Sequence, residues 1–227
     1  KIANGDVVAF IDDDAIADET WIEKLVHAYK TEDAIAAGGK MIPKWTAEKP
    51  SFLPEEFYWL IGVTHRGFAD NEGEVQNTFG SNISFRREVF LNLEGFNPNI
   101  GGRQGSKNLQ GGETELCVRM HAEYNKRVYY IPDAEVAHKV FTYRTNPAWL
   151  FDRAFWQGYS KRAMETLTPD TDTKETAFLE QLLTEFIPVR CRSLVADPSL
   201  LSITQLGVLF ALTGTVGAGY LYGILKW

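Results

Sequence analysis

The fold is decided by one stretch of the chain, Gly5-Asp6-Val7-Val8-Ala9-Phe10-Ile11-Asp12-Asp13-Asp14. Residues 7–11 form a continuous apolar run that is typical of a strand buried on both faces of a parallel sheet. In open α/β sheets, ligands bind beyond the carboxyl ends of such strands, where the three aspartates stand. Crowded carboxylates repel one another unless a cation joins them, so the triplet predicts a Mg²⁺ or Mn²⁺ site completed by phosphate oxygens. The alternative is an acidic turn that caps a helix beginning near residues 18–20.

The composition limits the class of protein. The 227 residues are 44% hydrophobic and 23% charged, which is ordinary for a globular chain. A net charge of −7 argues against a nucleic-acid-binding protein, because such proteins normally present a basic face. Cys117 and Cys191 lie far apart without the spacing of a zinc site or a disulfide framework.

The two ends of the chain carry separate signals. A parallel strand needs neighbours on both sides, so we expect further strands of the sheet to precede Lys1. Residues 199–225 contain no charged side chain, and about 20 such residues suffice to span a bilayer. They predict a transmembrane or membrane-inserted helix; the alternative is a glycine-rich helix buried in the protein. Arg190 and Arg192 before it, against Lys226 after it, favour a catalytic part on the cytoplasmic side of the cell membrane.

Three further segments combine polar residues with the apolar spacing of a strand or a helix. Ile83 and Phe85 alternate as in a half-buried strand, and a helix is predicted to begin near Glu113. A carboxylate there is also what the helix dipole favours, so capping is the alternative role of Glu113. Strand-like residues 128–132 and 134–138 end at His138, which is either a metal ligand or a satisfied core histidine. The remaining expectations are a helix at 21–29, a strand at 34–39, a loop and short helix at 41–77, a short helix at 87–93, a mobile glycine-rich loop at 101–108, an amphipathic helix at 147–164, a polar linker at 168–174 and an apolar helix at 178–189.

The order of these motifs resembles the inverting glycosyltransferases of family 2, which have the GT-A fold. The resemblance covers residues 1–138. The matching motifs are the DxD segment at residues 3–15 with Asp12-Asp13-Asp14, the strand Gly80-x-Asn82-x-Ser84-Phe85-Arg86, the acidic helix start Gly112-Glu113-Thr114-Glu115-Leu116-Cys117-Val118-Arg119 and the strand Val128-x-Tyr130-x-Pro132-x-Ala134-x-Val136-x-His138. Two positions depart from the family, which usually reads Glu-Asp-x-Asp/Glu at the helix: here Gly112 stands first and Glu113 replaces the aspartate.

The resemblance implies an α/β fold, a GT-A-like and mainly parallel sheet with flanking helices, followed by amphipathic helices and the membrane helix. It divides the chain into a catalytic part at 1–145, a helical extension at 146–198 and the membrane segment at 199–225. The implied catalytic residues are Glu113 as the base and Glu115 as an orienting group or alternative base. The implied metal ligands are Asp12, Asp14 and His138, and the implied donor-binding residues are Asp12, Asp13, Asp14, Asn82 and Arg86.

The resemblance also implies the substrates. A divalent metal, Mn²⁺ or Mg²⁺, would hold a nucleotide-diphosphate sugar. The segment Arg153-Ala154-Phe155-Trp156-Gln157-Gly158-Tyr159-Ser160-Lys161 is similar to haloarchaeal members that extend dolichyl-phosphate-linked glycans for surface-protein N-glycosylation. We therefore expect transfer of a hexose or hexuronic acid to a lipid-linked acceptor at the membrane. The alternatives are a membrane-tethered, non-catalytic scaffold and a polysaccharide synthase, although the Gln-x-x-Arg-Trp signature of synthases is not present.

Overall fold

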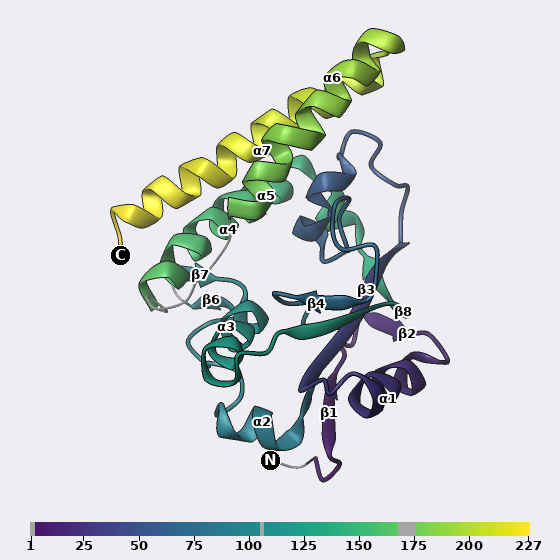
Figure 1. The fold of residues 1–227 in the computed structure, drawn as a ribbon. Coiled ribbons are helices and arrows are strands. Elements are labelled where there is room, and N and C mark those ends of the chain that lie inside the picture. The colour runs from purple at the N-terminus through teal and green to yellow at the C-terminus, as the bar shows by residue number, and fades with distance from the viewer. Residues whose placement is uncertain (1–2, 105–106, 168–175) are drawn as a thin grey trace.

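The computed structural model describes residues 3–104, 107–167 and 176–227 as an α/β unit with a layer of helices at one end (Figure 1). The sheet has the order β1-β5-β3-β8-β2, and β4 also pairs with β8. Its strands are β1 (Val7–Phe10), β2 (Ala15–Ala17), β3 (Ala36–Trp45), β4 (Gly73–Val75), β5 (Ile83–Arg86) and β8 (Val128–Val140), and a separate hairpin is formed by β6 (Gly102–Gln104) and β7 (Lys107–Leu109).

The helices cover both faces of the sheet and one of its ends (Figure 1). Helix α1 packs on β3 and β8, while α2 and α3 pack on the side of β5. The helices are α1 (Trp21–Thr31), η1 (Glu55–Ile61), α2 (Arg87–Asn92), α3 (Gly112–Tyr124), η2 (Thr142–Thr145), α4 (Pro147–Leu167), α5 (Thr176–Gln181), the π-helical turn η3 (Leu182–Phe186), α6 (Ile187–Ala196) and α7 (Leu200–Ile224).

The sheet is mixed, which corrects the expectation of a mainly parallel sheet. Among the described strands, only β3 and β8 pair in parallel, with a bulge between Gly39 and Met41. Strand β5 lies between β1 and β3 and runs antiparallel to both, and β2 and β4 pair antiparallel to β8. Strand β1 has β5 as its neighbour and exposes Ala9, so the expected burial on both faces is not found in the described residues. An apolar run can complete its ladder in either direction, and hydrophobicity therefore does not encode strand direction.

Gly39 lets β3 and β8 approach each other closely near Asn82. A Cβ at Gly39 would lie 2.0 Å from the Ala134 carbonyl oxygen, so no side chain fits there. The amide of Asn82 fills the same region, donating to the carbonyl oxygens of Ala134 at 2.8 Å and Lys40 at 3.1 Å. Trp21 of α1 donates its indole N–H to Asn82 Oδ1 at 2.8 Å. This hydrogen-bond network around Asn82 fixes α1, β3 and β8 relative to one another.

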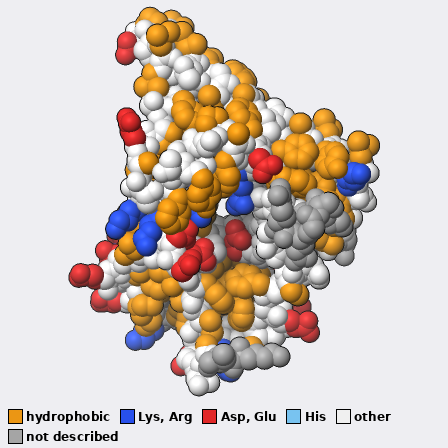
Figure 2. All heavy atoms as spheres, turned by 180° about the vertical axis from the view of Figure 1, so that it is seen from behind, with side chains coloured by type: hydrophobic (Ala, Val, Ile, Leu, Met, Phe, Trp, Pro, Cys, Tyr) orange, Lys and Arg blue, Asp and Glu red, His pale blue; other side chains and the backbone are white. Residues whose placement is uncertain are grey.

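Helix α7 is part of the folded unit. It has the length and apolar composition of a membrane-spanning helix, the one such helix among the described residues. Its Leu209 and Leu212 are nevertheless fully buried in a core that includes Leu60 and Phe186. Gly219 lets it approach α4 so closely that a Cβ there would lie 1.9 Å from the Phe155 carbonyl oxygen. The back view shows apolar side chains gathered over the helical layer (Figure 2).

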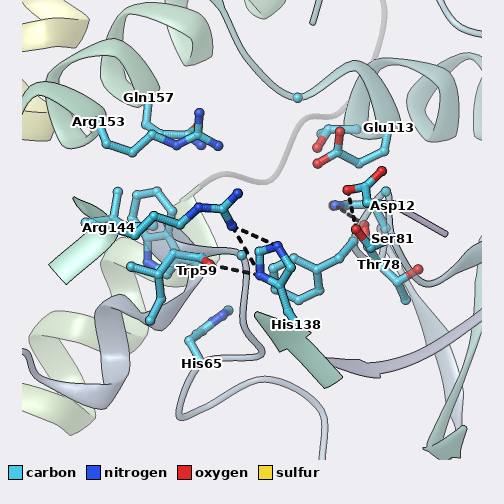
Figure 3. A pocket seen from close by; sticks show the side chains of 18 of the residues that line it. Asp12, Trp59, His65, Thr78, Ser81, Glu113, His138, Arg144, Arg153 and Gln157 are labelled. Atoms are coloured by element: carbon cyan, nitrogen blue, oxygen red, sulfur yellow. Dashed lines mark hydrogen bonds between the residues drawn. The ribbon is translucent and has the colours of Figure 1, made fainter. Parts of the chain in front are cut away.

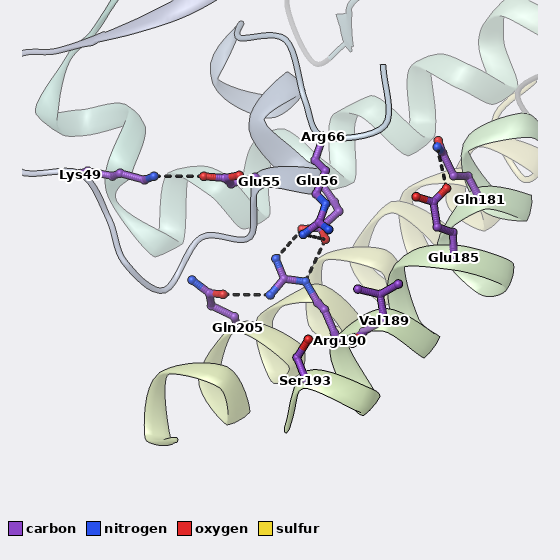
Figure 4. Close-up of polar contacts among 10 residues, drawn as sticks. All are labelled: Lys49, Glu55, Glu56, Arg66, Gln181, Glu185, Val189, Arg190, Ser193 and Gln205. Carbon is purple, nitrogen blue, oxygen red and sulfur yellow. Dashed lines mark hydrogen bonds and ion pairs between the residues drawn. The ribbon is translucent and has the colours of Figure 1, made fainter. Parts of the chain in front are cut away.

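A buried ion pair joins the helical layer to the rest of the chain (Figure 4). Glu56 of η1 is 1% exposed and accepts from Arg190 of α6 at 2.9 and 2.6 Å. Arg190 also donates to Gln205 of α7 at 2.8 Å. Because a buried carboxylate without its cation is costly, this network holds α6 and α7 in place over η1.

Most expected elements are present with shifted bounds. The strand expected at 34–39 continues to Trp45, and β5 is buried along residues 83–85 where a half-buried strand was expected. The expected mobile loop at 101–108 overlaps both strands of the β6–β7 hairpin, and its residues 105–106 lie outside the described chain, as does the whole of the expected linker at 168–174. Cys117 is buried and Cys191 exposed, and both are free thiols.

Candidate active site

A cavity of about 590 Å³ opens between the sheet and the helical layer. Side chains from five places in the sequence converge on it (Figure 3). Asp12 follows β1, Glu113 stands in the first turn of α3, His138 lies in β8, Arg144 in η2 and Arg153 in α4. The cavity therefore brings together the three predicted residues Asp12, Glu113 and His138, as well as two arginines that were not predicted.

Asp14, His138 and Arg144 form one cluster at the wall of the cavity. Asp14 Oδ1 lies 3.3 Å from His138 Nε2. Arg144 donates from one Nη to His138 Nε2 at 2.8 Å and from the other to Asp14 Oδ2 at 2.9 Å. The guanidinium thus supplies the positive charge that holds a carboxylate and an imidazole against each other.

His138 is buried and its ring is held in one orientation. Its Nδ1 lies 3.1 Å from the Ile61 carbonyl oxygen, which only accepts, so Nδ1 carries the proton. Nε2 then presents a lone pair to Arg144. Burial first, and the Arg144 charge second, lower the pKa of His138 below its ordinary value, which favours this neutral form. Gly62, with φ at 76°, makes room for the ring, because a Cβ there would lie 2.6 Å from His138 Cε1.

Glu113 points into the cavity from the start of α3, opposite Arg153 and Gln157 of α4 (Figure 3). Gly111 precedes the helix with φ at 90°, the left-handed conformation that glycine adopts without strain. Burial is the main cause that raises the pKa of Glu113, and the charge of Arg153 opposes this rise. A carboxylate with a raised pKa beside an open cavity is a suitable general base.

The aspartate triplet divides into three different environments. Asp12 lines the cavity and accepts a short hydrogen bond from the Ser81 hydroxyl. Asp13 is exposed in the turn between β1 and β2 and does not line the cavity. Asp14 belongs to the cluster with His138. Within the described chain, no side-chain hydrogen bond caps α1: Asp18 Oδ1 accepts from the backbone N–H and hydroxyl of Thr20, the residue that precedes the helix.

Besides Asp13 and Asp14, three further predicted site residues do not line this cavity. Asn82 is buried in its hydrogen-bond network with α1, β3 and β8. Arg86 donates to the carbonyl oxygens of Ala34 and Tyr29, at 2.9 and 3.1 Å. Glu115 is buried and accepts from Arg119 at 2.6 and 2.8 Å. The structure thus gives these side chains internal contacts and separates Glu115 from Glu113, although both stand in one helical turn.

Several cavity residues were missed by sequence reasoning. Arg144 follows the last strand without any pattern, and Arg153 lies on a helix whose sequence is basic on more than one side. His65 is half-buried between Phe68 and Phe178, and its desolvation lowers its pKa to about 4. The signal that was present for Arg153 is its spacing of four from Gln157 and eight from Lys161, which places the three on one helical face.

The donor set fits a divalent cation. Asp14 Oδ1 and the lone pair of His138 Nε2 face each other at 3.3 Å, with the Arg144 charge beside them. Mn²⁺ and Mg²⁺ accept carboxylate ligands, and one or two of these together with phosphate oxygens suffice. Within the described residues, no group of three His, Cys, Asp or Glu side chains stands close enough to bind a metal ion without such help. A cation here would therefore take its remaining ligands from the phosphate oxygens of a bound diphosphate.

Comparison with known proteins places the chain among glycosyltransferases. The sequence pattern of "Glycosyl transferase family 2" matches residues 1–93. The chain is 48% identical over 226 residues to the glucosyl-dolichyl phosphate glucuronosyltransferase of Haloferax volcanii, covering 99% of this chain and 72% of that protein. It is 26% identical over 160 residues to the succinoglycan biosynthesis protein ExoM of Rhizobium meliloti, covering 69% of this chain and 47% of that protein.

Solved structures resemble the fold. The mannosyltransferase PcManGT from Pyrobaculum calidifontis, solved with GDP-Man and Mn²⁺, superposes with a TM-score of 0.51 at 14% sequence identity. That match covers 99% of this chain and 64% of the mannosyltransferase chain, so this chain spans less than two thirds of its length. At this identity the likeness establishes the GT-A-like fold and confirms the expected fold class.

Proposed function

Because the chain belongs to glycosyl transferase family 2, we propose that it transfers a hexuronic acid from a nucleotide-diphosphate sugar to a lipid-linked acceptor, a glycan on dolichyl phosphate. The observation that carries this proposal is the pairing, in one cavity, of the Glu113 carboxylate with the Asp14–His138–Arg144 cluster. A transferase of this kind needs a base for the acceptor hydroxyl and positive charge for the diphosphate. The relative from Haloferax volcanii, named for a glucosyl-dolichyl phosphate acceptor and a glucuronosyl donor, supports the choice of substrates.

Glu113 is the proposed general base. Its carboxylate accepts the proton from the acceptor hydroxyl while that oxygen attacks the anomeric carbon of the donor sugar. Direct displacement from the opposite face inverts the anomeric centre. Burial raises the pKa of Glu113, whereas the helix dipole at the start of α3 and the Arg153 charge across the cavity favour the ionised carboxylate and oppose that rise.

Asp12, Asp14 and His138 are the proposed ligands of a Mn²⁺ or Mg²⁺ ion, and Asp13 is proposed to approach the donor from the same turn. When bound, the cation would neutralise charge on the diphosphate leaving group. Arg144 would exchange its contact with Asp14 for one with phosphate oxygens, since a guanidinium binds phosphate and carboxylate with the same geometry. Asn82 and Arg86 act on the donor indirectly, by fixing the strands that carry the aspartates.

We place the enzyme at the cell membrane, with its cavity on the cytoplasmic side. Helix α7 and the preceding arginines support this location. The lipid-linked product would serve cell-surface protein N-glycosylation.

The proposal is tested by incubating the protein with Mn²⁺, a glucosyl polyisoprenyl phosphate and a panel of UDP- and GDP-linked sugars that includes glucuronic acid. The expected product carries one added hexuronic acid with inverted anomeric configuration, read by mass spectrometry and NMR. A retained configuration would contradict direct displacement. An Asp14→Asn variant that keeps the metal dependence of the parent would exclude Asp14 as a ligand.

A further inference from the structure

A second, apolar groove lies beside the active-site cavity. It has a volume of about 480 Å³ and runs between α4, the α5–η3 segment and α7. Its lining is apolar except for Lys161, Glu165, Thr213 and Tyr220. Leu221 on its edge is 64% exposed and Leu179 is 49% exposed, so the groove opens to the surface over the helical layer.

The groove and the active-site cavity share a wall. Trp59 of η1 lines both of them. Its ring packs against Phe178 of α5 with centroids 6.0 Å apart, and its indole N–H is buried with no hydrogen-bond partner in the described part of the chain. An apolar chain in the groove would lie against this ring, and an oxygen of the head group would satisfy its N–H.

One face of α4 connects the two spaces. Arg153, Gln157 and Lys161 recur at intervals of four residues, so they lie along one side of the helix. Arg153 and Gln157 line the active-site cavity and Lys161 lines the groove. Eight residues advance about 12 Å along a helix. Arg153 Nε is buried and lacks a partner within the described residues, which leaves a charged donor for an anion.

We infer that this groove holds the isoprenoid chain of the lipid acceptor, with the lipid phosphate along the α4 face between Arg153 and Lys161 and the acceptor sugar at Glu113. The inference rests on the proposed function, because it assigns the path of the acceptor to that same site. Along this path the protein presents first the apolar groove, then the cationic face of α4, then the Glu113 carboxylate. A lipid chain, a phosphate and a hydroxyl-bearing sugar follow in the same order.

The contact between α4 and α7 fixes one wall of the groove, and Gly217 offers a position from which a larger side chain can fill it. Gly158 of α4 and Gly219 of α7 hold the two helices in backbone contact, since a Cβ at either would lie 1.9 Å from a carbonyl oxygen of the other helix. Gly217 lines the groove, and a Cβ there would meet no atom within 4 Å. A Gly217→Phe side chain therefore enters the groove without displacing the backbone.

The experiment compares Gly217→Phe with Gly207→Phe in the full chain. Gly207 lies on the same helix, also has open space at its Cβ and does not line the groove. Steady-state transfer is measured to two acceptors that carry the same sugar phosphate, one on a long polyisoprenyl chain and one on a short citronellyl chain. We expect Gly217→Phe to raise KM for the long-chain acceptor roughly tenfold, because the excluded isoprene units lose apolar burial. KM for the short-chain acceptor and both KM values of Gly207→Phe stay at the parental level.

If KM for the long-chain acceptor is the same in Gly217→Phe as in the parent, the groove assignment is overturned, while the transferase activity stays established. A second measurement judges the groove even if no sugar is transferred. A polyisoprenyl phosphate with a diazirine in its chain is photocrosslinked to the parent and to both variants. Labelling of α5–η3 and α7 peptides that Gly217→Phe removes and Gly207→Phe retains supports the groove. Labelling elsewhere, or labelling that Gly217→Phe leaves unchanged, overturns it.

Discussion

Asp14 Oδ1 lies 3.3 Å from His138 Nε2, although one residue follows the first strand of the sheet and the other lies near the end of its last. Strand β2 explains the meeting, because it pairs antiparallel with β8 and sets Ala15 opposite His138. The turn that leads from β1 to β2 thus carries the aspartates to the histidine. Arg144 then bridges both side chains.

The position of Arg144 predicts competition with a metal ion. Replacing Arg144 with glutamine frees Asp14 and the Nε2 lone pair of His138, so Mn²⁺ should bind the protein without donor about tenfold more tightly, a gain of about 1.4 kcal/mol. Isothermal titration calorimetry measures this affinity. Arg153→Gln is the matched control and should leave Mn²⁺ binding unchanged, because in the described structure it is His138 and Arg144, not Arg153, that contact the Asp14 carboxylate. Loss of Mn²⁺ binding in Arg144→Gln would contradict this account of the cluster.

The raised pKa of Glu113 predicts a pH-dependent stability. The folded state holds the Glu113 proton more tightly than the unfolded chain, so the stabilising contribution is present at low pH and is lost as pH rises through the folded-state pKa. At any pH above the ordinary glutamate pKa, this buried carboxyl therefore costs stability. Glu113→Gln should raise the melting temperature at neutral pH by a few degrees, about 2–4 °C for each kcal/mol regained. Thermal unfolding at neutral and acidic pH measures this gain, which should shrink in acid; a lower melting temperature at neutral pH would contradict it.

The same pKa predicts the pH profile of transfer. The base works as a carboxylate, so kcat/KM should fall as pH decreases through the folded-state pKa of Glu113, at a higher pH than for an ordinary glutamate. A profile of kcat/KM against pH locates this acidic limb. A limb at or below the usual glutamate range would argue that another group accepts the proton.

The buried Glu56–Arg190 pair predicts a large loss of stability when it is broken. Arg190→Met leaves Glu56 buried with only the longer 3.9 Å approach of Arg66, and the cost should be about 3 kcal/mol. Arg192→Met, a change at an exposed position on the same helix, should alter the unfolding free energy by less than about 0.5 kcal/mol. Chemical denaturation in detergent measures both. Equal effects would show that the pair does not anchor α6.

The contact between α4 and α7 predicts opposite effects for two glycines. Gly219→Ala should destabilise by about 1–3 kcal/mol, because its Cβ would overlap the Phe155 carbonyl oxygen. Gly214→Ala has open space and should instead stabilise by up to about 1 kcal/mol through helix propensity. Thermal unfolding of both variants decides the matter, and destabilisation by Gly214→Ala alone would refute the described packing.

The sequence carried enough information to predict individual elements. The apolar run before Asp12 predicted β1, the spacing of Trp21, Leu25 and Tyr29 predicted α1, and the apolar pattern after Glu113 predicted α3. These features are local, since each depends on periodicity or on a single conformational preference. Strand direction is set by distant partners, and for that reason the antiparallel insertion of β5 between β1 and β3 was not predicted.

The sequence predicted only those residues of the candidate site that belong to motifs occurring in a fixed order along the chain. The motifs named Asp12, Glu113 and His138, which the structure brings together in the cavity, and Asp14, which contacts His138. Arg144 and Arg153 come from a short helix and a long one that follow the sheet, and their approach to the cavity depends on how α4 packs on η1 and α7. Glu115 has the same local pattern as Glu113, and only the position of Arg119, together with the carbonyl oxygens of Leu93 and Gly95, separates their roles.

The role of Glu113 as the base is central to the proposed reaction, and one measurement tests it directly. Transfer to the lipid acceptor is compared for the parent, Glu113→Gln and Glu115→Gln, with Mn²⁺ present and rates normalised to folded protein. Glu113→Gln should lower kcat about 10²–10⁴-fold. Glu115→Gln should lose stability through its broken contact with Arg119 while its folded fraction keeps a rate close to the parent's. Transfer by Glu113→Gln as fast as by the parent would contradict the account.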